Sequence, residues 1–114
     1  MYAIRNIFIF LFLLYTSISL AQSTVESASE AYRTEDYKKS IQLYEQVVAQ
    51  QISEGKESAE IYYNLGNAYF RNGETAKAIL NYERALLLNP GDSDIRHNLR
   101  FARTRIEDKI DTSD

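Results

Sequence analysis

The chain has 114 residues, of which 45% are apolar and 25% charged, so it has room for at most one globular domain with a thin core. Its 13 Lys and Arg residues against 16 Asp and Glu residues give a net charge of −3, which argues against a protein that binds nucleic acid by neutralising phosphates. The lack of cysteine excludes disulfides and thiolate metal sites, and a single histidine excludes a histidine-rich metal centre.

The N-terminal segment, residues 1–21, has the pattern of a secretory signal peptide. Arg5 precedes an apolar run from Ile7 to Tyr15, and small residues occupy two alternate positions in Ser19-Leu20-Ala21. The unbroken run has about nine residues, whereas a membrane-spanning helix needs about 20. We therefore expect secretion across the inner membrane, a periplasmic location and cleavage before Gln22. The mature chain then has 12 basic and 16 acidic residues, a net charge of −4. The alternative is an uncleaved N-terminal segment that anchors the protein.

Two helices are expected next, over residues 22–34 and 37–52. Ala28, Ala31 and Tyr32 recur at helical spacing in the first of them. Ser40, Tyr44 and Val47 do so in the second. The two apolar stripes predict a pair of helices that pack against each other.

Another helix pair is predicted over residues 58–72 and 75–88. In the first helix the apolar positions are Tyr62, Leu65, Gly66 and Tyr69, so the glycine belongs to the buried stripe. Glycine costs a helix interior about 1 kcal/mol relative to alanine, and close approach of a neighbouring backbone or ring is the usual reason to keep it. Gly73 stands where a helix C-terminus needs a residue that accepts positive φ.

In the second helix of this pair, Ala78, Ile79, Tyr82, Ala85 and Leu86 share one face, and Pro90 stops the helix. A helix, a tight turn and a second helix cannot bury their apolar faces alone, and such units stack. Eight residues over Ala59–Asp92, a length of about 34, resemble the complete signature of a tetratricopeptide repeat, and only the first departs from the usual tryptophan: Tyr62, Leu65, Gly66, Tyr69, Ala78, Tyr82, Ala85 and Pro90.

The resemblance implies an all-α fold, an antiparallel helix-pair solenoid of the tetratricopeptide-repeat (TPR) type with two repeats and a C-terminal capping helix. Residues 22–55 are then a degenerate first repeat, in which Ala28 replaces the glycine and Ser40 the crossing alanine. Residues 59–92 are the second repeat, and together with the terminal helix they complete one domain over residues 22–114. The interval from Tyr44 to Tyr82 exceeds the usual repeat length by about four residues, which lie between the repeats as a longer helix end or a longer loop.

A terminal helix is predicted over residues 93–110, and no second helix follows it. Its apolar stripe consists of Ile95, Leu99, Ala102, Ile106 and Ile110. Phe101 lies off this stripe and is expected to stay exposed. Arg103 and Glu107 are spaced for an ion pair within the helix, and the arginines at 96, 100, 103 and 105 form either a solvated face or a surface for an acidic partner or anionic lipid.

In the family that the chain resembles, the first helices of successive repeats line a groove that binds a partner protein. The resemblance places nine residues on or near such a groove: Tyr63, Asn64, Asn67, Phe70, Arg71, His97, Asn98, Phe101 and Arg105. Asparagine donates to and accepts from a peptide backbone, and arginine holds a carboxylate with two hydrogen bonds. The alternative is that Asn64 and Asn67 only make hydrogen bonds within the repeat.

The sequence contains no nucleophile motif, glycine-rich phosphate loop or zinc-protease motif, so we expect no catalytic residues, no metal site and no cofactor. The predicted function is a non-catalytic adaptor that binds another protein, such as a membrane-associated protein of the bacterial cell envelope, and no nucleic acid. The alternative is a structural or regulatory subunit of an obligate complex, with the terminal helix buried in a partner or in a second copy.

A narrower resemblance covers about half of the chain. The N-terminal signal, the repeat that ends in NPGDSDIRHNLRFAR and the following IEDKID are similar to the repeat segment of Bat-type aerotolerance proteins, which are bacterial envelope proteins. This resemblance implies a location in the envelope and a scaffold role related to aerotolerance.

Overall fold

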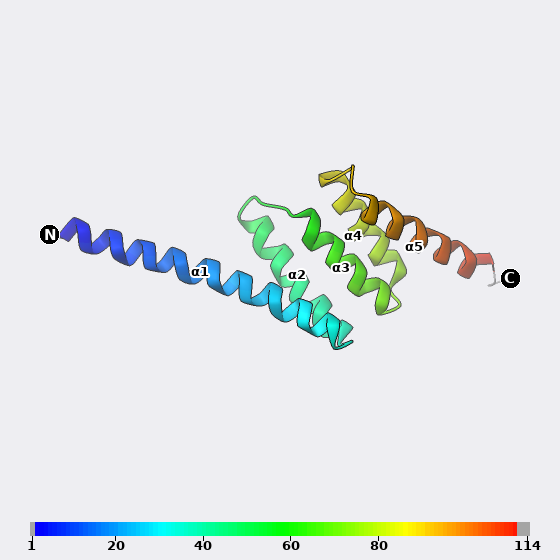
Figure 1. The fold of residues 1–114 in the computed structure, drawn as a ribbon, viewed down its shortest axis with the longest axis horizontal. Coiled ribbons are helices and arrows are strands. Elements are labelled where there is room, and N and C mark those ends of the chain that lie inside the picture. The colour runs from blue at the N-terminus through cyan, green and yellow to red at the C-terminus, as the bar shows by residue number, and fades with distance from the viewer. Residues whose placement is uncertain (1, 112–114) are drawn as a thin grey trace.

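The computed structural model describes the backbone of residues 2–111 and the side chains of residues 4–13 and 23–111. Within that part of the chain all regular structure is helical, and each helix packs against the next one in the chain. The helices are α1 (Tyr2–Arg33), α2 (Tyr37–Ser53), α3 (Ala59–Arg71), α4 (Thr75–Leu88) and α5 (Ser93–Asp111) (Figure 1). The predicted all-α solenoid of antiparallel helix pairs is confirmed.

Side-chain caps define where three of the helices begin. Asp36 Oδ1 accepts a hydrogen bond from the Lys39 amide at 3.3 Å, and Ser58 Oγ accepts one from the Ile61 amide at 3.3 Å. Asp92 Oδ1 accepts from the Ile95 amide at 3.1 Å. These oxygens satisfy amides that have no partner within their helices, which stabilises each start by about 1 kcal/mol.

The extra residues of the first repeat are divided between a helix and a loop. α2 has 17 residues where α4 has 14, and five residues connect α2 to α3 where four connect α4 to α5. The turns within the two repeats, residues 34–36 and 72–74, have equal length. The tight helix pair is therefore the repeated unit, and the connection between units absorbs the difference.

The crossing of α3 and α4 explains the helical glycine. A Cβ atom on Gly66 would lie 2.7 Å from both Cδ1 and Cε1 of the Tyr82 ring and 3.3 Å from the Ala78 carbonyl oxygen. In the first repeat, Ala28 and Ser40 are fully buried at the corresponding crossing, where the Ser40 hydroxyl donates to the Ala28 carbonyl at 2.9 Å. The predicted close approach at Gly66 is confirmed.

The terminal helix packs on α4 through Ile95, Leu99 and Ala102, which are all buried. Ile106 is half-buried and Ile110 is exposed, so the predicted stripe was wrong at its C-terminal end. The reason is length: α5 has 19 residues and α4 has 14, a difference of about 7 Å at 1.5 Å per residue.

The predicted ion pair between Arg103 and Glu107 was also wrong, because Arg103 pairs with Glu83 of α4. This contact joins α5 to the helix it covers. Both side chains are about half exposed, so the pair contributes little to stability and mainly restricts the rotation of Arg103.

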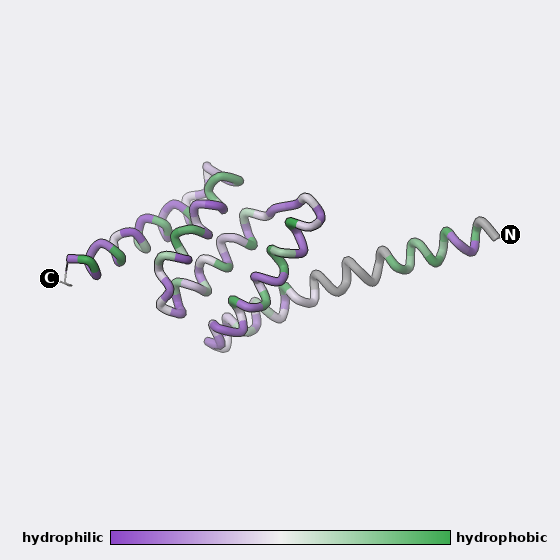
Figure 2. The backbone as a smooth tube through the Cα atoms, turned by 180° about the vertical axis from the view of Figure 1, so that it is seen from behind, coloured by the Kyte–Doolittle hydropathy of each residue, from purple (hydrophilic) through white to green (hydrophobic). Residues whose placement is uncertain are grey.

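The first helix is longer than predicted. A start near residue 22 was expected, but α1 begins at Tyr2, because no glycine or proline interrupts residues 2–33. Its N-terminal half extends beyond the other helices (Figures 1 and 2). The apolar side chains of residues 7–13 are exposed. The predicted cleavage segment, residues 19–21, lies outside the side chains that the structure describes. Among the described residues, no helix combines the length and apolar content needed to cross a membrane.

Candidate functional site

A hollow of about 320 Å³, which we call the central hollow, lies between α1, α3 and α5. These are the first helices of the two repeats and the terminal helix. Eight residues line it: Tyr32, Asn67, Phe70, Arg71, Tyr82, His97, Asn98 and Phe101. Six of the nine residues predicted for a partner-binding groove are among them, so the structure brings most of that set together.

Hydrogen bonds between three helices build the floor of the central hollow. The Tyr82 hydroxyl of α4 donates to Asn67 Oδ1 of α3 at 2.6 Å. The Asn98 amide of α5 donates to the same oxygen at 3.0 Å and to the Tyr63 hydroxyl at 3.0 Å. The Asn67 oxygen therefore accepts from Tyr82 of its own repeat and from Asn98 of the terminal helix, while its amide nitrogen donates to no described residue.

The pKa values of the two tyrosine hydroxyls that line the central hollow, Tyr82 and Tyr32, are raised. Burial raises the pKa of Tyr82 above its ordinary value, and the nearby Tyr63 and Tyr32 hydroxyls raise it further. Burial likewise raises the pKa of Tyr32. The hollow thus presents neutral hydroxyl groups, which act as hydrogen-bond donors.

Two aromatic rings form the apolar wall of the central hollow. The centroids of Phe70 and Phe101 are 5.6 Å apart with an angle of 60° between the ring planes. Phe101 is 53% exposed, as expected from its place off the buried stripe of α5. An exposed ring held against a second ring offers a partner a rigid apolar contact.

Two basic side chains, Arg71 and His97, line the central hollow. The Arg71 guanidinium lies 5.2 Å from the centroid of the Tyr37 ring and 3.8 Å from Glu35 Oε1. His97 is exposed on the opposite side, on α5. None of the eight lining residues is acidic.

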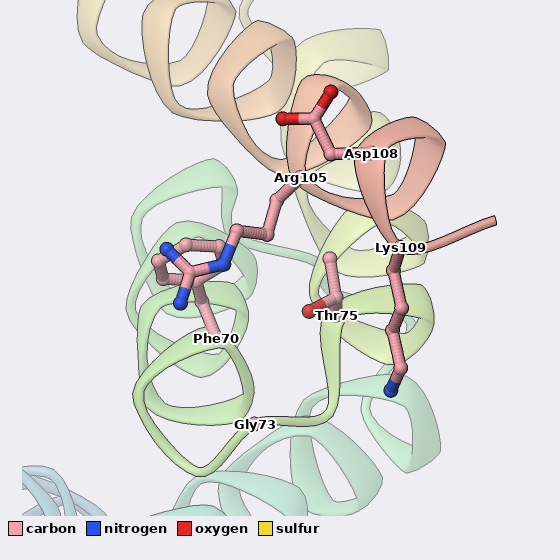
Figure 3. A pocket seen from close by; sticks show the side chains of 6 residues that line it. All are labelled: Phe70, Gly73, Thr75, Arg105, Asp108 and Lys109. Atoms are coloured by element: carbon pink, nitrogen blue, oxygen red, sulfur yellow. The ribbon is translucent and has the colours of Figure 1, made fainter. Parts of the chain in front are cut away.

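The other three predicted residues lie outside the central hollow. Tyr63 packs beneath it, with its ring centroid 6.0 Å from that of Tyr82. Asn64 is half-buried on α3 and lines neither hollow, and its side chain lowers the pKa of Tyr44 of α2, which burial raises. The Arg105 guanidinium lies over the Phe70 ring, 6.0 Å from its centroid (Figure 3).

Arg105 belongs to a second hollow of about 550 Å³, which we call the edge hollow. It lies between α5 and the turn that joins α3 to α4 (Figure 3), and its lining residues are Phe70, Gly73, Thr75, Arg105, Asp108 and Lys109. Phe70 lines both hollows. The resemblance to the repeat family placed Arg105 with the other residues, because a family pattern gives helix positions and not the direction that a long side chain takes.

Two lining residues were missing from the predicted set. Tyr82 was assigned to the core, where its ring belongs, although its hydroxyl reaches Asn67. The interval from Tyr32 to Phe70 equals the interval from Tyr44 to Tyr82. Alignment of the two repeats would therefore have placed Tyr32 at the position that Phe70 occupies in the second repeat.

The central hollow has hydrogen-bond donors, aromatic walls and two basic side chains, which suits binding more than bond breaking. In the part of the chain that the structure describes, no three acidic or histidine side chains are grouped to hold a metal ion. Residues 59–92, which comprise α3, α4 and the turn after them, match the family model of the tetratricopeptide repeat. No curated protein matches the chain.

Proposed function

We propose that this tetratricopeptide-repeat protein is a non-catalytic adaptor, which binds another protein of the bacterial cell envelope in its central hollow. Such repeats generally mediate protein–protein interaction, and stacked helix pairs create the surfaces they use. The observation that carries the proposal is the convergence of six predicted groove residues from α3 and α5 on one hollow, where the Phe101 ring is half exposed.

The size of the central hollow favours a segment of the partner over a small molecule. Its volume of about 320 Å³ is at the lower end of ligand pockets, which run from about 300 to 1,000 Å³. That space suits one or two side chains of a peptide. Aromatic and arginine side chains carry much of the binding energy at protein interfaces, and Phe70, Phe101 and Arg71 provide them here.

Affinity purification from crosslinked native cells tests the proposal. The double substitution His97→Ala and Phe101→Ala changes two exposed side chains of the hollow, while Leu87→Ala changes a leucine of α4 that is 84% exposed and outside it. We expect the double variant to lose a partner that the wild type and Leu87→Ala retain, with helical content unchanged in all three. Equal recovery by the double variant would remove the central hollow from the interaction.

The proposed location is the periplasm, after cleavage before Gln22. The signal pattern of residues 1–21 supports it, and so does the exposure of residues 4–13, which take no part in the core of the repeats. Mass spectrometry of the protein from native envelopes gives the N-terminus. An N-terminus at Met1 or Tyr2 would favour the alternative, an uncleaved anchor. The proposed role in aerotolerance also depends on a location in the envelope.

Exposed apolar side chains on α5 favour a second function, that of a subunit in an obligate complex or a self-associating protein. Phe101 and Ile110 are both exposed on this helix. Light scattering on the purified protein separates the two functions. An adaptor is a folded monomer, whereas a subunit that needs α5 covered is oligomeric or unstable alone.

A further inference from the structure

We propose that two copies of this chain pair through the outer face of α5, with their α5 helices antiparallel. The pairing surface, which we call the outer stripe, consists of five residues at intervals of four, four, three and four: Arg96, Arg100, Thr104, Glu107 and Asp111. This inference rests on the proposed self-association and gives it a surface and an orientation. It uses no residue of the central hollow.

The outer stripe lies on the side of α5 that is turned away from α4. At 100° per residue its five members fall within about 80° of the helix circumference, and all of them are exposed. The residues that pack on α4, namely Ile95, Leu99 and Ala102, lie outside this sector and are buried. None of the five lines the central hollow or the edge hollow, so the outer stripe is a separate surface.

The charges of the outer stripe are segregated along the helix. Arg96 and Arg100 lie in the N-terminal half of α5, and Glu107 and Asp111 lie in the C-terminal half. Like charges four residues apart destabilise a helix, and this order also opposes the helix dipole. The first turn does hold an acidic residue and the last turn a basic one, but the outer stripe has the reverse order. The stability of a single α5 helix therefore does not explain the stripe.

The four charged side chains of the outer stripe have no ion pair or hydrogen bond among the described residues. Near the middle of the stripe the polar groups are already used. The Thr104 hydroxyl donates to the Arg100 carbonyl at 3.0 Å, and the neighbouring Arg103 pairs with Glu83 of α4. The stripe thus offers two positive and two negative groups to a partner, on either side of a centre with little net charge.

A second copy of α5 complements this pattern when it runs antiparallel. The interval from Arg96 to Asp111 and the interval from Arg100 to Glu107 have the same midpoint, between residues 103 and 104. A two-fold axis through that midpoint places Arg100 of each copy opposite Glu107 of the other, and Arg96 opposite Asp111. The two helix dipoles are then antiparallel as well. In a parallel pair, by contrast, like charges would face each other.

The resulting pair is weak and reversible. Each ion pair is exposed, so it contributes little and is weakened by salt. A single pair of helices of 19 residues, each about 28 Å long, also gives an interface at the low end of the usual size range. At low concentration the chain is therefore the folded monomer expected of an adaptor. At high local concentration the pair joins two central hollows, which strengthens binding to a partner with two matching segments.

Disulfide cross-linking of the full chain tests this pairing, because the chain has no cysteine of its own. Thr104→Cys places a thiol next to the proposed axis, whereas Ser93→Cys places one on the same face of α5, about 16 Å from the axis. Under mild oxidation at low salt, we expect Thr104→Cys to form covalent dimers at least about tenfold faster than Ser93→Cys. Equal rates would overturn the inference, since they indicate a parallel pair or unspecific association through the exposed apolar residues of α1.

Charge reversal in the Thr104→Cys chain tests the ion pairs. Arg100→Glu and Glu107→Arg should each slow cross-linking by about tenfold, because like charges then face each other twice in the pair. Both substitutions in one chain should restore the rate, and so should an equal mixture of the two single variants. Circular dichroism checks that every variant keeps its helical content. Unchanged rates in the single variants, or a double variant as slow as they are, would overturn the inference.

Partner capture separates this inference from the proposed function. Arg100→Glu changes no residue of the central hollow, so it should still recover the partner protein from crosslinked native cells. If the cross-linking fails while recovery of the partner depends on His97 and Phe101, the pairing is wrong and the adaptor function stands.

Discussion

Adding a single methyl group at Gly66 tests the packing of the second repeat. In an open helix, Gly→Ala stabilises by about 1 kcal/mol, because alanine has the higher helix propensity. At Gly66 the new Cβ would lie 2.7 Å from two carbons of the Tyr82 ring. That ring is buried and its hydroxyl is held by Asn67, so it cannot swing aside freely.

Overpacking of this kind costs about 1 to 3 kcal/mol. Contacts of 2.7 Å with two carbons of a buried ring belong in the upper part of this range, about 2 to 3 kcal/mol. After the gain in propensity of about 1 kcal/mol is subtracted, we expect Gly66→Ala to lower the free energy of unfolding by about 1 to 2 kcal/mol. Urea denaturation followed by circular dichroism at room temperature measures it. A second experiment in the Tyr82→Leu background isolates the ring, since there Gly66→Ala should no longer destabilise.

The first repeat provides the matched control. Ala28 already occupies the corresponding position and is fully buried, so Ala28→Gly should destabilise by about 1 to 2 kcal/mol through lost propensity and a lost methyl contact. The same pair of residues, exchanged in the two repeats, is thus unfavourable in both directions. A Gly66→Ala protein as stable as wild type would refute the packing of Tyr82 on this glycine.

Three further predictions concern stability. Asn81 is buried, and its Oδ1 has no hydrogen-bond partner among the described residues. Because the corresponding residue of the first repeat is Leu43, Asn81→Leu should raise the free energy of unfolding by about 1 kcal/mol in urea titrations. Burial raises the pKa of Tyr69 and Tyr82, so above about pH 10 the unfolded chain releases protons that the folded chain keeps. The melting temperature should therefore stay constant below about pH 10 and fall above it. The fall should be less steep in Tyr82→Phe. A chain that ends after Asp92 should unfold or aggregate, because it exposes the α4 surface that Ile95, Leu99 and Ala102 cover. Phe101→Ala should melt at the same temperature as the wild type. Light scattering and circular dichroism check both variants.

The helices could be predicted because the signals that bound them are local. Gly73 accepts a φ of +82° at the end of α3, and Pro90 follows the end of α4 closely. Burial was predicted well where two helices of similar length face each other, as for Ala78 and Tyr82. It failed at Ile110, because the spacing of apolar residues does not show how far the neighbouring helix extends.

The site could be predicted only in part, for a different reason. The resemblance to the repeat family placed nine residues of α3 and α5 near a groove, but it could not show which of them line one hollow. The hydrogen-bond partners of Asn67 come from α4 and α5, far from it in the sequence. The positive φ of Glu35 had no signal in its residue type; the Asp36 amide donates to the Ala31 carbonyl at 2.8 Å and closes the end of α1 there.

Photo-crosslinking from position 101 in native cells tests most directly whether the central hollow binds another protein. A photoreactive phenylalanine analogue replaces Phe101, whose ring is already half exposed, and the same analogue at Leu87 of α4 serves as the control. We predict one defined adduct with a protein of the cell envelope from position 101, weakened by Arg71→Gln, and none from position 87. An adduct from position 87 with none from position 101 would contradict binding in the central hollow.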